Sequence, residues 1–80
     1  MRILVADDDK HFLRILADIL AGAGHSVIEA RDGKQALELA LEKNPGLIIL
    51  DAVLPGLLGT QISRKLLARE SGTKQIIMIT

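Results

Sequence analysis

Residues 47–51 read Leu-Ile-Ile-Leu-Asp, a run of four aliphatic residues that ends at a single acid. A continuous apolar run of this length is typical of a strand that is buried on both faces, as in a parallel sheet covered by helices. Residues 3–7 repeat the pattern, because Ile-Leu-Val-Ala is followed by Asp7 and then by Asp8 and Asp9. The repetition predicts two buried strands that both end at carboxylates.

Helical patterns separate the strand-like runs. After Asp9, apolar residues recur at spacings of three and four and mark one wide apolar helical face, made of Phe12, Leu13, Ile15, Leu16, Ile19, Leu20 and Ala23. The same spacing recurs after Asp32, so two helices are predicted with these acids as N-caps. The second helix is expected to end before Asn44, where the sequence continues with Pro and Gly. A third helix is predicted from a cap at Thr60 to a break at Ser71.

Strands and helices therefore alternate along the whole chain. The predicted strands cover residues 2–7, 26–30, 47–50 and 75–80. Short connections between alternating strands and helices favour right-handed crossovers, so the predicted architecture is an open parallel α/β sheet covered by helices. Ligands of such sheets bind at the carboxyl ends of the strands. The acids that follow two of the strands would lie at this edge.

Length and composition exclude several classes of protein. The chain has 80 residues, with 10 basic and 10 acidic side chains and no Cys, so disulfides and thiolate metal sites are excluded. A net charge of zero gives no electrostatic reason to expect a nucleic-acid or membrane-surface binder. The apolar runs are far shorter than the roughly 20 residues that cross a bilayer. We therefore expect a small cytoplasmic domain.

The acids that follow the two strands form the candidate site. If the two strands are neighbours, Asp7, Asp8 and Asp51 converge at one edge of the sheet. Two carboxylates about 4 Å apart repel by about 4 kcal/mol at an effective dielectric constant of about 20, so the group must protonate, separate or bind a cation. Oxygen ligands alone favour a hard ion, and Mg²⁺ fits best. The alternative is that the acids only cap a helix and end a strand.

Taken together, the motifs resemble the receiver domain of two-component response regulators. The resemblance spans all 80 residues in order. It implies a flavodoxin-like, doubly wound parallel sheet with four strands in the order 2-1-3-4 and three helices. The segments that carry it are Ile3 to Asp9, Gly33 to Leu37, Leu47 to Asp51, Leu54-Pro55-Gly56 with Gly59, and Ile76 to Thr80.

The resemblance also implies a role for each matching residue. Asp51 matches the phosphoacceptor, which takes a phosphoryl group from a sensor histidine kinase or a phosphotransfer protein. Asp7 and Asp8 match the acidic pair that holds Mg²⁺, and the main-chain carbonyl of Val53 matches the position that completes the coordination. Thr80 matches the hydroxyl residue that switches toward the phosphoryl group. A signalling domain of this kind is not an enzyme beyond slow self-phosphorylation and self-dephosphorylation.

Three departures from the family pattern are visible. Leu58 stands where an acid usually precedes Gly59, so Thr60 would cap the third helix, and Gly46 follows Pro45 where an acid is common. The family also continues with a fourth helix, a fifth strand and a fifth helix. We therefore expect residues 1–80 to be a receiver domain that is incomplete at its C-terminus, with no residue here for the family's later lysine or aromatic switch residue.

Two other functions fit parts of the pattern. A small Mg²⁺-dependent phosphatase would use Asp51 as a nucleophile but needs a general acid two residues later, where Val53 cannot serve. An interaction module would keep the receiver fold without phosphorylation. Its apolar edge strand, Gln75 to Thr80, would then pair with a second copy.

Overall fold

The computed structural model describes residues 1–51, 54–56, 61, 64–65 and 75–79. Its strands and helices follow one another as β1 (Arg2–Ala6), α1 (Lys10–Gly22), β2 (Ser26–Ala30), α2 (Gly33–Lys43), β3 (Leu47–Asp51) and β4 (Gln75–Ile79). Of the predicted third helix, residues 61, 64 and 65 are helical, and the rest lies outside the described residues. No helix in the described part of the chain is long and apolar enough to cross a bilayer.

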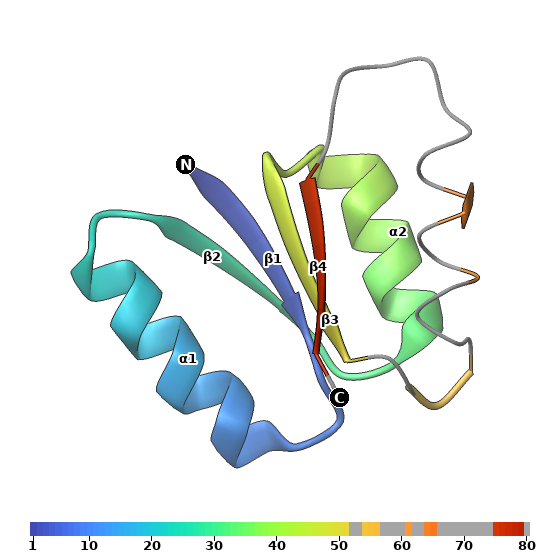
Figure 1. The fold of residues 1–80 in the computed structure, drawn as a ribbon, viewed down its shortest axis with the longest axis horizontal. Helices are drawn as coiled ribbons and strands as arrows, with labels where there is room; N and C mark the ends of the chain where they lie inside the picture. Colours follow the sequence, from blue (N-terminus) through green and yellow to red (C-terminus); the bar gives the residue numbers. More distant parts are fainter. Residues whose placement is uncertain (52–53, 57–60, 62–63, 66–74, 80) are drawn as a thin grey trace.

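The strands form a four-stranded parallel sheet in the order β2-β1-β3-β4, as predicted (Figure 1). In the middle of the sheet, Leu4 of β1 lies between Ile28 of β2 and Ile48 of β3. On the far side of β3, Ile49 pairs with Ile77 of β4. All carboxyl ends therefore meet at one edge, which is the lower edge of the sheet in Figure 1.

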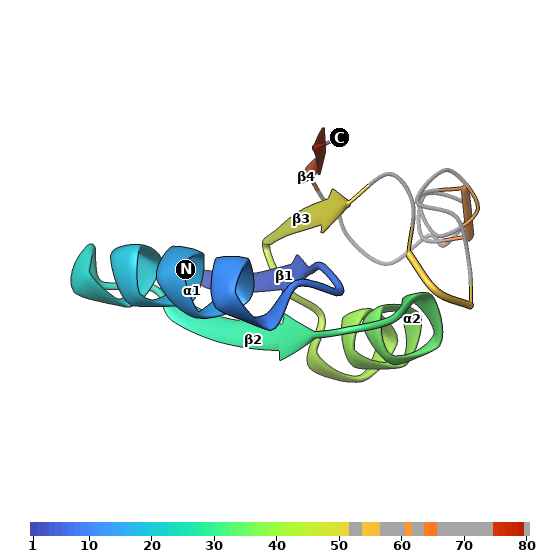
Figure 2. The same ribbon diagram turned by 90° about the horizontal axis from the view of Figure 1, so that it is seen from below.

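The two described helices cover opposite faces of the sheet, with α1 on one side and α2 on the other (Figure 2). On the first face, Leu13 of α1 packs against Ile3 and Val5 of β1. On the second face, the small side chains of Ala36 and Ala40 let α2 approach the sheet closely. The cluster there also contains Leu4, Ala6, Ala30, Ile48, Leu50 and Leu54. Apolar packing on both faces explains why the central strands consist of continuous aliphatic runs.

The predicted N-caps Asp9 and Asp32 are confirmed, whereas the predicted cap Thr60 lies outside the described residues. The side chain of Asp9 accepts hydrogen bonds from the backbone N–H groups of His11 and Phe12, and that of Asp32 accepts one from Gln35. These bonds satisfy N–H groups that have no partner inside a helix. At its other end α2 stops at Asn44, which has a left-handed φ of 49°, so the predicted end of this helix is also confirmed.

The apolar face predicted for the first helix is wider than the face of α1 that is buried. Leu13 and Ala17 of α1 are buried, whereas Ile15 and Ile19 are 61% and 62% exposed. A spacing of three and four residues marks a stripe broader than the contact that one helix makes with a sheet, because only part of that stripe can face the strands. The outer part of the stripe therefore lies on the surface.

Candidate metal site

Strand register places the first and last acids of the site. Ala6 of β1 pairs with Leu50 of β3, so the next residue on each strand is an aspartate, Asp7 or Asp51. The strand predicted over residues 2–7 ends one residue earlier, at Ala6, although the Asp7 N–H still donates to the Ala30 carbonyl at 3.1 Å. Asp51, predicted to follow β3, is its last residue and pairs with Ile79 of β4. Parallel pairing therefore brings the two carboxylates to one edge.

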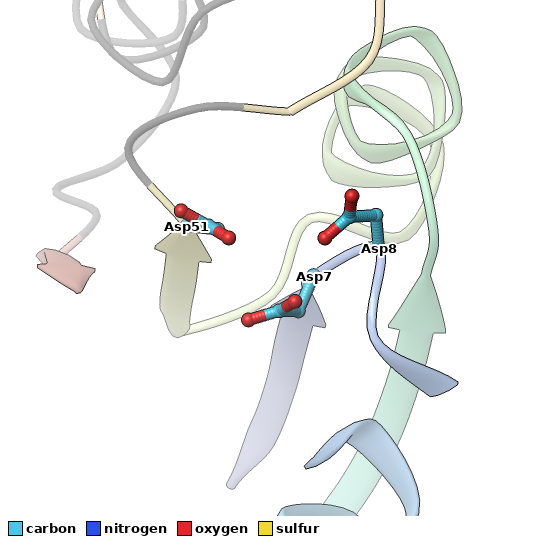
Figure 3. A group of neighbouring side chains, drawn as sticks. All are labelled: Asp7, Asp8 and Asp51. Carbon is cyan, nitrogen blue, oxygen red and sulfur yellow. The ribbon is translucent and has the colours of Figure 1, made fainter. Parts of the chain in front are cut away.

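Asp8 completes a cluster with these two residues. Each of the three side chains offers a carboxylate oxygen, and these oxygens all lie within 4.8 Å of one another. Figure 3 shows the three carboxylates converging from the end of β1, the following loop and the end of β3. The expected convergence of Asp7, Asp8 and Asp51 is confirmed. A set of oxygen donors this close together suits a hard divalent cation.

The electrostatics of the cluster act mainly on Asp7, which is only 8% exposed. Burial raises the pKa of its carboxyl above the ordinary value, and the hydrogen bond that its Oδ1 accepts from the Asp9 N–H at 2.9 Å opposes this effect. The charges of Asp51 and then Asp8 raise the pKa further, as does a hydrogen bond with the Asp8 side chain. Ionised Asp7 is therefore disfavoured unless a cation compensates its charge.

A pH-dependent stability difference follows for Asp7→Asn. An acid whose pKa is raised on folding stabilises the fold fully below the pKa of the unfolded chain, near 3.8, and loses that contribution as the pH rises through the folded pKa. Without metal at neutral pH, the variant should therefore be more stable than the wild type. Asparagine keeps the oxygen that accepts from Asp9. Urea unfolding at several pH values measures the difference.

The stability difference between Asp7→Asn and the wild type should shrink as the pH falls toward 3.8, because Asp7 of the wild type is then protonated and uncharged. Asp18→Asn is the matched control, because Asp18 is an exposed acid on the surface of α1. Its stability should change little over the same range. If Asp7→Asn were less stable than the wild type at neutral pH without metal, the inference that the fold disfavours ionised Asp7 would be wrong.

The loop that follows Asp51 rests on the start of α2. The Gly33 N–H donates to the Pro55 carbonyl at 2.7 Å, and Leu54 is buried against the α2 face of the sheet. Gly56 has a φ of +94°, a left-handed conformation that favours glycine. These contacts hold the described part of the loop against the start of α2.

A cavity of about 260 Å³ opens beside the cluster, lined by Asp7, Asp9, Phe12, Asp51 and Ile79. The sequence placed Phe12 on the core face of a helix, and its proximity to the acids was missed. The sequence does contain one signal for this proximity. Phe12 lies in the first turn of the helix that Asp9 caps, and this turn follows the acids directly. Two predicted site positions, Val53 and Thr80, lie outside the described residues, so their roles stay predictions.

The strand order and the acid cluster at the carboxyl edge define the class of protein: a flavodoxin-like α/β domain with a cluster of carboxylates at the ends of its first and third strands. The model of the response regulator receiver domain family matches residues 3–80. The chain belongs to this family of phosphoacceptor signalling domains in two-component systems.

Curated relatives agree with this assignment. The DNA-binding response regulator MtrA of Mycolicibacterium smegmatis is 42% identical over 79 residues, which cover 99% of this chain and 34% of that protein. The transcriptional regulatory protein SrrA of Staphylococcus aureus is 40% identical over 78 residues, or 98% of this chain and 32% of that protein. The chain thus spans about a third of the length of these relatives.

Solved structures show the same fold. The receiver domain of the hybrid histidine kinase CckA superposes with a TM-score of 0.88 at 31% identity, covering 98% of this chain and 73% of that one. The chemotaxis response regulator CheY4 of Vibrio cholerae gives a TM-score of 0.91 at 26% identity, covering 96% of this chain and 65% of that one. The predicted receiver fold is confirmed.

Proposed function

We propose that Asp51 accepts a phosphoryl group from a histidine kinase or a phosphotransfer protein, with Mg²⁺ held by the neighbouring carboxylates. The convergence of Asp7, Asp8 and Asp51 in a member of the receiver family is the observation that carries the proposal. The main-chain carbonyl of Val53 and the hydroxyl of Thr80 are proposed as a further Mg²⁺ ligand and as the switch residue. We place this activity in the cytoplasm.

In the proposed transfer, an oxygen of the Asp51 carboxylate attacks the phosphorus atom of a phosphohistidine. The phosphorus–nitrogen bond breaks as the phosphorus–oxygen bond forms, and its electron pair returns to the ring. A ring protonated on its other nitrogen then leaves as neutral imidazole. The products are an acyl phosphate on Asp51 and an unmodified histidine.

The neighbouring acids make this transfer depend on a cation. Asp7 and Asp8 are negative charges beside the attacking oxygen, and they repel an incoming phosphoryl group. Mg²⁺, when bound, cancels this charge and polarises the phosphoryl oxygens. The donor set fits the ion, since it consists of oxygens only and burial already penalises an uncompensated Asp7. The protein's own part is to hold the carboxylates together at the sheet edge.

Replacing Asp8 by alanine tests the metal site. We expect Mg²⁺ to stabilise the wild type by about 2.7 kcal/mol at a concentration of about 100 times its dissociation constant. Loss of one carboxylate should weaken Mg²⁺ binding by at least about tenfold. Thermal unfolding at increasing Mg²⁺ concentrations gives the midpoint for each protein, and Asp18→Ala is the exposed control. An unchanged midpoint in Asp8→Ala would remove Asp8 from the site.

One observation favours a second candidate function, self-association. Among the described residues, β4 pairs with β3 only, so its other backbone edge has no strand beside it. Ile77 and Met78 are 49% and 39% exposed and point to opposite faces of the sheet. We propose that the edge strand predicted over residues 75–80 pairs with the same strand of a second copy.

Sedimentation velocity at increasing protein concentration tests this pairing. We expect reversible association of the wild type and a monomer for Ile77→Lys, because a charge on the apolar edge opposes strand pairing. Ile15→Lys is the matched control, since Ile15 is also an exposed isoleucine but lies on α1. A wild type that stays monomeric at high concentration would eliminate the candidate.

A further inference from the structure

A second, larger cavity lies on the β2 side of the sheet. Its volume is about 430 Å³, within the range of about 300–1,000 Å³ that is typical of small-molecule sites. It shares no lining residue with the cavity beside the acid cluster. We call it the basic pocket, and its polar lining consists of Lys10, His11, Arg14, Glu29, Arg31 and Gln35.

The basic pocket takes its residues from α1, β2 and α2 and from the connection between β2 and α2. Lys10 and Arg14 are one turn apart on α1, which places them on the same side of that helix. Glu29 belongs to β2, and Arg31 lies in the short connection from β2 to α2. Gln35 holds this connection, because its side-chain oxygen accepts a hydrogen bond from the Arg31 N–H at 2.9 Å. The pocket is thus built at the carboxyl end of β2, the edge where open α/β sheets bind ligands.

The charges in the pocket are unbalanced. Lys10, Arg14 and Arg31 are positive and only Glu29 is negative, so two positive charges remain in a chain whose net charge is zero. Arg14 is held loosely, at 3.7 Å from Asp18 and 3.8 Å from Glu29. No carboxylate of the described residues lies within 4.0 Å of the side-chain nitrogens of Lys10 or Arg31. An anion would therefore meet uncompensated donors.

We propose that the basic pocket binds the phosphate group of a small phosphorylated molecule. A phosphate monoester near neutral pH carries close to two negative charges, which matches the excess of positive charge. The planar guanidinium groups of Arg14 and Arg31 suit phosphate oxygens, and the amide nitrogen of Gln35 adds a neutral donor. The volume of the pocket suits a small molecule. This site uses none of Asp7, Asp8 and Asp51.

Amide NMR titration of the 80-residue chain tests the proposal, with inorganic phosphate and phenyl phosphate as probes. A chelator keeps divalent cations from the acid cluster. We expect saturable shifts confined to residues 10–14 and 29–35, with phenyl phosphate binding more tightly if the pocket also holds the organic part. Arg31→Gln and Lys10→Gln should each weaken binding by about tenfold, because each removes a charge-assisted contact.

Two controls make the outcome specific. Lys43→Gln removes a charge from the other end of α2 and should leave the affinity unchanged. Asp51→Asn should also leave the affinity of the basic pocket for phosphate unchanged. The pocket proposal and the phosphoacceptor proposal can therefore fail independently of each other. The inference is overturned if no saturable shift occurs in the pocket, if Arg31→Gln binds like the wild type, or if Lys43→Gln loses as much affinity as Arg31→Gln.

Discussion

Replacing Asp51 by asparagine is expected to reduce phosphoryl labelling to background. Asparagine has nearly the same shape but lacks the anionic oxygen that attacks phosphorus, so no acyl phosphate can form. The chain is incubated with Mg²⁺ and an acyl phosphate donor, and intact mass spectrometry measures the added phosphoryl group. Sensitivity of the label to hydroxylamine identifies it as an acyl phosphate.

The control for this experiment is Asp18→Asn. Asp18 is an exposed aspartate on α1 that takes no part in the acid cluster, so its variant should be labelled like the wild type. Loss of labelling in both variants would indicate a general effect of charge or folding. Labelling that persists in Asp51→Asn would place the phosphoacceptor on another residue and refute the proposed function.

Replacing Leu4 by alanine is expected to have the largest effect on stability, a loss of about 2–5 kcal/mol. Leu4 is 0% exposed and lies at the centre of the sheet, between Ile28 and Ile48. Its removal leaves a cavity that neighbouring strands cannot close without losing their register. A domain of this size rarely has more than about 3–5 kcal/mol of net stability, so the variant should be largely unfolded at room temperature.

Urea unfolding followed by circular dichroism measures this loss, with Leu41→Ala as the matched control. Leu41 is the same residue type on α2 but is 40% exposed, so its replacement should cost much less. Equal losses at the two positions would show that the packing between the sheet and its helices does not determine the stability of this fold.

Local sequence patterns were sufficient to predict the strands and the helix caps at Asp9 and Asp32, whereas the acid cluster also required β1 and β3 to be neighbours. Aliphatic runs that end at Asp7 and Asp51 indicate buried strands, and parallel pairing then brings their ends together. The order of the strands came from the family resemblance, because periodicity within one segment carries no information about its neighbours. The exposure of Ile15 and Ile19 was missed for the same reason, since it depends on which part of α1 faces the sheet.

The basic pocket was also beyond prediction from local patterns. Lys10, Arg14, Arg31 and Gln35 are separate polar residues in the sequence, and no spacing rule connects them. Only the packing of α1 over β2 and the hydrogen bond between Gln35 and the Arg31 N–H bring them to one place. Sites built from one motif can be found in a sequence, whereas sites assembled across three elements need the fold.

The hydrogen bond from the Gly33 N–H to the Pro55 carbonyl makes one amide a reporter of the loop after Asp51. Gly33 is buried at the start of α2, and Pro55 lies four residues beyond Asp51 in the chain. A displacement of that loop must lengthen this 2.7 Å contact and release the amide proton to exchange with solvent. The exchange rate of a single proton, far from Asp51 in sequence, can therefore follow the conformation of the loop.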